Sequence, residues 1–80
     1  MSRTFASPRH KALIRFVIQQ REAAGLTQRD LAKKLKRHQS FVATYELGQK
    51  RLDIIELLEL AEAIGFDPHE AIEAARKAKR

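Results

Sequence analysis

Residues 25–48 read GLTQRDLAKKLKRHQSFVATYELG, and this stretch is the most informative part of the chain for its fold. Thr27 is typical of a helix N-cap, and the side chain of Asp30 can accept from the Thr27 amide, as in a capping box. Apolar residues follow at helical spacing, and Gly48 suits the left-handed conformation that ends a helix. The stretch therefore predicts two short helices joined by a turn.

Each of the two predicted helices has one apolar side. The residues on these sides are Leu31, Ala32 and Leu35 in the first helix, and Phe41, Val42 and Tyr45 in the second. Helices of about eight residues are not stable alone in water, so both must pack against the rest of the chain. The turn between them is Lys36-Arg37-His38.

Three further helices flank this pair. Ser7 with Pro8 begins the first, which ends at Gly25. Asp53 is placed to cap another, which ends at Gly65, and the last begins at Asp67-Pro68 with Glu70 at its third position. The predicted core contacts of these three helices are Leu13, Ile14, Val17, Ile18, Ile54, Leu57, Leu58, Ala61, Ile64, Ile72 and Ala75. No strand-like alternation occurs, so we predict an all-α fold of five helices in a single domain, residues 1–80.

Composition excludes several classes of function. The chain has 80 residues and no cysteine, so disulfides, thiolate metal sites and thiol nucleophiles are ruled out. His10, His38 and His69 are too scattered to predict a metal site, and we expect no cofactor. Neither a glycine-rich phosphate loop nor an acid-base cluster is visible, so we do not expect an enzyme. Without a membrane span or an N-terminal signal pattern, a cytoplasmic protein is expected.

The charge is unevenly distributed along the chain. The formal net charge is +6, which favours a polyanionic partner. Residues 26–51 carry seven Lys or Arg against Asp30 and Glu46, a balance of +5. Residues 52–75 carry seven acids and no Lys or Arg, and a basic tail, RKAKR, follows at residues 76–80. DNA would be attracted to the first region and repelled by the second.

An ordered set of residues in this chain resembles the Xre and phage-repressor (Cro-like) family of helix-turn-helix transcriptional regulators. The matching residues are Gly25-Leu26-Thr27-Gln28, Leu31-Ala32, Gln39-Ser40, Tyr45-Glu46, Gly48, Leu60-Ala61 and Ile64-Gly65. The resemblance covers roughly residues 11–68, with residues 26–48 as the motif core. It implies a five-helix, lambda-repressor-like DNA-binding domain in which the second and third helices form the helix-turn-helix.

The resemblance also implies a function. Such a protein would be a sequence-specific regulator of transcription, in most cases a repressor, that binds double-stranded DNA as a homodimer. Two reading helices would enter the major groove at the two half-sites of a palindromic operator. The dimer surface would come from the region of Leu52 to Ile54 or from the fifth helix with Phe66 and Ile72, although these residues can equally be core.

Position in the family motif suggests roles for individual residues. The expected base contacts are Gln39, Ser40 and Thr44, flanked by His38 and Ala43. Gln39 is the strongest candidate, because glutamine can bind adenine bidentately. The expected phosphate contacts are Gln28, Arg37, Gln49, Lys50 and Arg51, with Arg29 and Lys36 as weaker candidates. Arg21 and Glu46 would form an ion pair that ties the reading helix to the first helix.

Two residues depart from the family pattern, both in the turn. Lys36 stands where the family usually has glycine, because the turn commonly needs a positive φ, so we expect a strained or altered turn. His38 stands where Ser, Thr or Pro is more usual, which leaves the N-cap of the reading helix unpredicted.

Two alternatives remain open from the sequence. An antitoxin would use the same fold both to bind a toxin and to repress its own operon. A restriction-modification controller protein would bind DNA in the same way and differ in the genes it regulates. Binding to RNA is not favoured, because Phe41 and Tyr45 are predicted to be buried and leave no aromatic stacking surface.

Overall fold

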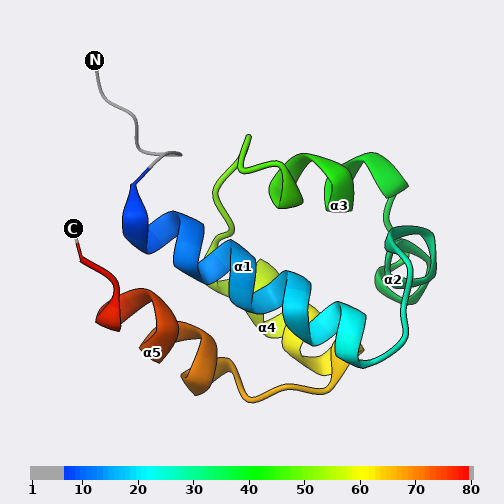
Figure 1. Cartoon of the computed structure of the whole chain (residues 1–80). Helices are drawn as coiled ribbons and strands as arrows, with labels where there is room; N and C mark the ends of the chain where they lie inside the picture. The colour runs from blue at the N-terminus through cyan, green and yellow to red at the C-terminus, as the bar shows by residue number, and fades with distance from the viewer. Residues whose placement is uncertain (1–6, 80) are drawn as a thin grey trace.

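The computed structural model describes residues 7–79, which form five α-helices and no strand (Figure 1). The helices are α1 (Pro8–Ala23), α2 (Gln28–Leu35), α3 (Gln39–Glu46), α4 (Ile54–Ile64) and α5 (Pro68–Lys77). α1 packs mainly against α5, and α2 packs mainly against α3. The all-α class and the five predicted helices are confirmed.

The helices begin where the predicted caps lie. The Ser7 side chain accepts from the amide of His10, and Thr27 and Asp53 cap α2 and α4 through complete capping boxes. Each cap satisfies amides that have no partner within the helix, which fixes where the helix starts. Gly65 ends α4 with a φ of 100°.

The core is built from all five helices. Its fully buried residues include Val17 of α1, Leu31 of α2 and Tyr45 of α3, together with Val42, Leu60 and Ala71. The ring of Phe66, in the α4–α5 link, meets Phe16 edge to face at a centroid distance of 5.4 Å. Phe66 is therefore a core residue, which is one of the two roles that the sequence left open for it.

The predicted apolar face of α4 needs correction. Ile54 is 61% exposed and Leu58 is 41% exposed, whereas Leu60, which was not predicted, is fully buried. The first turns of α4 are apolar on several sides, so periodicity alone does not identify the stripe that faces the core. The observed stripe runs through Leu57, Leu60, Ala61 and the partly buried Ile64.

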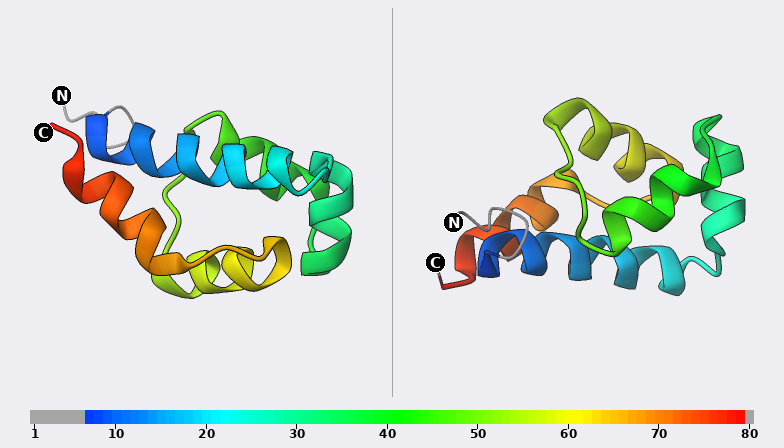
Figure 2. Two further views of the ribbon diagram at one scale, coloured as in Figure 1. Left: turned by 60° about the horizontal axis from the view of Figure 1, so that its bottom comes forward. Right: turned by 90° about the horizontal axis from the view of Figure 1, so that it is seen from above.

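The predicted contact of α5 is also wrong at one position. Ile72 is 47% exposed, and the neighbouring Ala71 is buried in its place. The small side chain of Ala71 allows α5 to pack closely against its main neighbour, α1. The larger Ile72 then lies at the edge of the buried side of α5. The N-terminal end of α1 and the C-terminal end of α5 meet at the same end of the molecule (Figure 2).

Within residues 7–79, no helix is both long enough and apolar enough to cross a membrane.

Candidate nucleic-acid interface

The start of α2 is fixed by a reciprocal pair of hydrogen bonds. The Asp30 amide donates to Thr27 Oγ1 and the Thr27 amide donates to Asp30 Oδ2, both at 3.0 Å. Hydrogen bonds with Thr27, from the backbone and from the side chain, lower the pKa of the Asp30 carboxyl. Gln28, the first residue of α2, is thereby held at the helix N-terminus, where free amides favour an anion.

The turn between α2 and α3 is left-handed at Lys36. Its φ is 57° and its ψ is 42°, and among the described residues it is the only non-glycine residue with a positive φ. The Lys36 amide donates to the Lys33 carbonyl at 3.1 Å, and the Arg37 amide donates to the Ala32 carbonyl at 3.0 Å. These bonds close the end of α2, while the Cβ of Lys36 makes the turn more costly than it would be with glycine.

His38 occupies the N-cap position of α3 without capping it through its side chain. Its Nδ1 lies 3.3 Å from the hydroxyl of Ser40. Both side chains are exposed at the start of the helix. The amides of the first turn of α3 therefore lack the side-chain acceptor that α1, α2, α4 and α5 have.

The two sides of α3 differ in burial. Val42 and Tyr45 are fully buried, and burial raises the pKa of the Tyr45 hydroxyl. On the other side Gln39 and Ser40 are exposed, and Ala43 and Thr44 are half-buried. Within residues 7–79, no hydrogen bond engages the side chain of Gln39 or Thr44. The polar side of α3 is thus presented to solvent by a helix whose opposite side is anchored in the core.

Arg21 and Glu46 tie α1 to the end of α3. Arg21 Nε donates to Glu46 Oε2 at 2.7 Å, and Arg21 Nη2 donates to Glu46 Oε1 at 3.1 Å, in a bidentate arrangement. Arg21 Nη1 also donates to the Leu26 carbonyl at 2.7 Å. The side chains of Arg21 and Glu46 are only 12% and 6% exposed, and the hydrogen bond to Glu46 raises the pKa of Arg21. Such a geometry is stronger and more directional than a surface ion pair.

Gln28 belongs to the same network. Its Nε2 donates to Glu46 Oε1 at 2.8 Å, so one carboxylate holds side chains from both α1 and α2. The sequence pattern did not indicate this bond, because the two residues are 18 positions apart and only the fold brings them together. The position of α3 relative to the N-terminus of α2 is consequently fixed by hydrogen bonds as well as by the core.

Two of the cations that were expected to contact phosphate, Arg37 and Lys50, lie over the ring of Phe41. The guanidinium carbon of Arg37 lies 4.4 Å from the ring centroid, and Nζ of Lys50 lies 5.4 Å from it. The positions of these cations over the aromatic ring are typical of cation–π interactions. Phe41 was predicted as core alone, and its ring is partly buried against the core while it also orients these two side chains.

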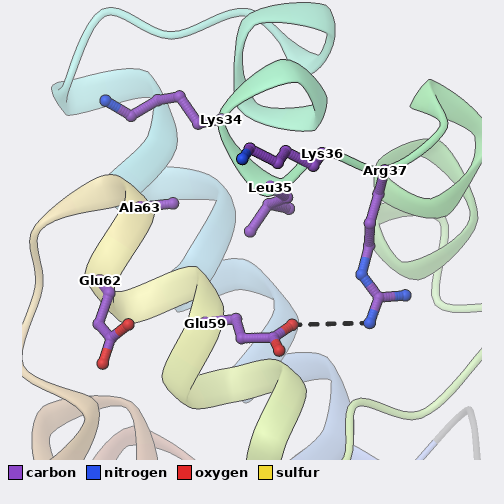
Figure 3. Close-up of a pocket in the computed structure, with 7 residues that line it drawn as sticks. All are labelled: Lys34, Leu35, Lys36, Arg37, Glu59, Glu62 and Ala63. Atoms are coloured by element: carbon purple, nitrogen blue, oxygen red, sulfur yellow. Dashed lines mark ion pairs between the residues drawn. The ribbon is translucent and has the colours of Figure 1, made fainter.

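Acids of α4 pair with the same two cations. Arg37 Nη2 lies 3.5 Å from Glu59 Oε1, as the dashed line in Figure 3 marks. Lys50 Nζ donates to Glu56 Oε1 at 2.9 Å. Glu56 also accepts from the Asp53 amide in the capping box of α4, and its side chain is only 12% exposed. Glu56 is therefore engaged on two sides and largely buried, and the spacing Asp53-x-x-Glu56, typical of a capping box, is the sequence signal that could have revealed part of this role.

The other expected phosphate contacts lie on α2, in the turn and in the loop after α3. Arg29 and Lys36 are exposed on α2 and in the turn, and Gln49 and Arg51 are exposed in the loop after α3. Beneath the turn lies an open hollow of about 640 Å³ between α2 and α4, lined by Lys34, Leu35, Lys36, Arg37, Glu59, Glu62 and Ala63 (Figure 3). Across residues 7–79, no group of three His, Asp or Glu side chains is placed to hold a metal ion.

Comparisons with known proteins agree with this geometry. Residues 13–74 match the sequence model of a helix-turn-helix domain. Among solved structures, the chain is similar to an XRE-family like protein from Pseudomonas syringae pv. tomato str. DC3000. The two share 40% sequence identity, the match covers 85% of this chain and 83% of that chain, and the TM-score is 0.79. No curated protein sequence matches the chain significantly.

The sequence match includes all of α2, the turn and α3, and the structural match also spans most of the chain. The resemblance predicted from the motif residues is thus confirmed. The chain belongs to the XRE family of helix-turn-helix DNA-binding proteins.

Proposed function

We propose that this protein is a transcriptional repressor that binds a palindromic operator as a homodimer, with α3 inserted in the major groove. The observation that carries the proposal is the outward face of α3. Gln39 and Ser40 are exposed on this face, and within residues 7–79 no hydrogen bond engages the side chain of Gln39. The opposite face and the C-terminal end of α3 are fixed by the core and by Glu46. A pre-positioned helix loses little freedom on entering the groove, which favours specific binding.

Base contacts come from the N-terminal half of α3. Gln39 is exposed in the first turn, where its amide can donate to and accept from adenine. Ser40 and His38 lie beside it, and Thr44 follows one turn later with Ala43. The methyl group of Ala43 suits contact with a thymine methyl, so α3 offers both polar and apolar readout.

Phosphate contacts flank α3 on both sides. The N-terminus of α2 with Gln28 and Arg29 approaches one strand, and the loop with Gln49 and Arg51 approaches the other. Lys36 and Arg37 extend the first group, and Lys50 extends the second. Arg37 and Lys50 lie over the ring of Phe41 and pair with Glu59 and Glu56 of α4. These contacts hold the two cations beside α3 until a phosphate competes with the carboxylates for them.

The dimer surface is best placed on α4. Ile54 is 61%, Ile55 62% and Leu58 41% exposed, and these three residues form one apolar patch in the first half of α4. Covering such a patch removes apolar area from water, at roughly 25 cal/mol per Å². In dimers of helix-turn-helix proteins the two reading helices bind half-sites about 34 Å apart, one turn of the duplex, and we propose the same spacing for a two-fold contact here.

The same apolar patch favours a second candidate function, that of an antitoxin. In that case another protein, and not a second copy of this chain, would cover Ile54, Ile55 and Leu58. A restriction-modification controller would be a homodimer on DNA like the repressor, so its distinction lies in the regulated genes. The mass of the complex formed through this patch distinguishes the antitoxin from the other two candidates, because it equals two copies of this chain only in a homodimer.

Selection of bound duplexes from a random DNA pool at moderate salt tests the proposed function. We expect enrichment of a palindromic sequence with half-sites one helical turn apart. Failure to enrich any sequence would contradict the proposal of a specific regulator. Enrichment of a single asymmetric half-site would leave specific binding in place and contradict the homodimer.

A further inference from the structure

The ring of Phe41 is a contact that two separate segments of the chain share. Arg37 lies in the turn before α3 and Lys50 in the loop after it. The guanidinium carbon of Arg37 lies 4.4 Å from the centroid of the ring, and Nζ of Lys50 lies 5.4 Å from it. One side chain of the reading helix therefore supports a cation that precedes this helix and a cation that follows it.

The ring itself is held by the core. Phe41 is partly buried and packs against the core residues. Its ring meets the ring of Tyr45 at a centroid distance of 5.4 Å and an interplanar angle of 62°, and Tyr45 is fully buried. Packing of this kind against a buried partner favours one orientation of the ring. The position of the ring is thus set by the fold before any DNA binds.

The contact with the ring does not depend on the hydrogen-bond partners of the cations. The attraction is electrostatic and acts between the positive charge and the face of the ring. In the free protein, Arg37 Nη2 lies 3.5 Å from Glu59 Oε1. Lys50 Nζ donates to Glu56 Oε1 at 2.9 Å. A phosphate can therefore replace a carboxylate while the cation keeps its place over the ring.

We propose that Phe41 is a positioning residue for DNA binding, whose ring holds Arg37 and Lys50 in place for phosphate without touching the DNA itself. This inference rests on the proposed function and deepens it. Without the ring, each of the two long side chains would have to be ordered as the duplex binds, at an entropic cost. Phosphate contacts carry no sequence information, so the ring acts on affinity and not on which bases are read.

Two variants without the ring, Phe41→Leu and Phe41→Met, test the proposal beside Phe41→Tyr, which keeps a ring. Phe16→Leu is the matched control, because Phe16 is also partly buried against the core and its ring also meets a partner edge to face at 5.4 Å. Melting curves first identify the folded variants. The affinity of each is then measured at one salt concentration for the selected operator duplex and for an unrelated duplex.

We expect the variants without the ring to bind both duplexes roughly fivefold more weakly than the wild type does, at the low end of the cost of ordering two long side chains. The ratio of the two affinities should stay at the wild-type value, whereas a displaced reading helix would lower it. Phe41→Tyr and Phe16→Leu should bind as the wild type does.

A double-mutant cycle with Arg37→Gln shows whether the ring acts through the cations. In the Arg37→Gln background the loss caused by Phe41→Leu should shrink to roughly twofold, since only Lys50 remains to be ordered. The inference is overturned by wild-type affinity in the variants without the ring, by a changed ratio of affinities, by an equal loss in Phe41→Tyr or Phe16→Leu, or by a loss that does not shrink in the cycle. A wild type that selects no duplex overturns the proposed function itself.

Discussion

At the scale of single residues, Lys36 shows how a functional element tolerates local strain. A non-glycine residue in the left-handed region costs about 1 kcal/mol or more, and Lys36 holds that conformation to close α2. The family resemblance predicted this strain, because the family usually has glycine at this position of the turn. The side chain of Lys36 is exposed beside α3, where a cation can offset its cost by contacting phosphate.

Replacing Lys36 with glycine should raise the free energy of unfolding by up to about 1 kcal/mol, because glycine takes a positive φ without a Cβ penalty. Denaturant unfolding measures the change. Lys34→Gly is the matched control, since it puts glycine in the last turn of the helix and should lower stability by a similar amount. A lower stability for Lys36→Gly would contradict the strain at this position.

Replacing Glu46 with alanine should lower the melting temperature markedly. The change leaves the largely buried Arg21 without its carboxylate and removes the acceptor of Gln28. Breaking a buried pair by deleting one partner costs roughly 3 kcal/mol or more, which in a domain of this size corresponds to a shift of more than about 10 °C. The double variant Arg21→Ala with Glu46→Ala should lose less than the sum of the two single losses, since the pair is coupled. A melting temperature equal to the wild type would refute this role for Glu46.

His10 gives the stability of the protein a dependence on pH. Burial, and then the positive charge of Arg51, lower the pKa of His10 below its usual 6.5. The folded state therefore favours neutral His10, and its contribution is complete above about pH 6.5 and declines as the pH falls toward the folded pKa. His10→Leu should remove that decline in a series of melting curves from pH 7.5 to 5. An unchanged pH dependence in His10→Leu would show that another group is responsible.

At the scale of helices, short sequence motifs predicted where a helix begins better than they predicted which side of it is buried. A cap requires only residues about three positions apart, so Ser7, Thr27 and Asp53 were identifiable from sequence. Which side of α4 faces the core depends on neighbouring helices, and periodicity placed Ile54 and Leu58 wrongly inside. The pairing of Arg21 with Glu46 was suggested by family resemblance, since no spacing rule links residues 25 positions apart.

The exposed part of α4 leads to a prediction about assembly. Ile55→Glu should convert a dimer to a monomer, because a charge buried in an apolar contact without a partner is unfavourable. Sedimentation of the free protein over a range of concentrations measures the change. Leu47→Glu is a matched control, since Leu47 is 72% exposed and lies at the end of α3, outside the patch on α4. A wild type that remains monomeric at high concentration, both free and bound to DNA, would contradict the homodimer.

At the scale of the whole molecule, the basic and the acidic segments of the sequence come into contact between α2 and α4. The acids of residues 52–75 lie mainly on α4 and α5, with Glu59 and Glu62 in the hollow beneath the turn (Figure 3). The basic residues surround α3 and the converging ends of α1 and α5. The sequence predicted the existence of two charged regions, but it could not predict that Glu56 and Glu59 would hold Lys50 and Arg37, because those contacts arise from tertiary packing.

The central claim is that α3 reads base sequence through its exposed side chains, and Gln39 tests it most directly. Selection from the random DNA pool should be repeated with Gln39→Ala, whose side chain cannot bond to a base. We expect the wild-type palindrome to be retained except at one base pair in each half-site, where the preference is lost, corresponding to roughly 1 to 3 kcal/mol of discrimination. A consensus identical to that of the wild type at every position would contradict the claim that this face of α3 reads the operator.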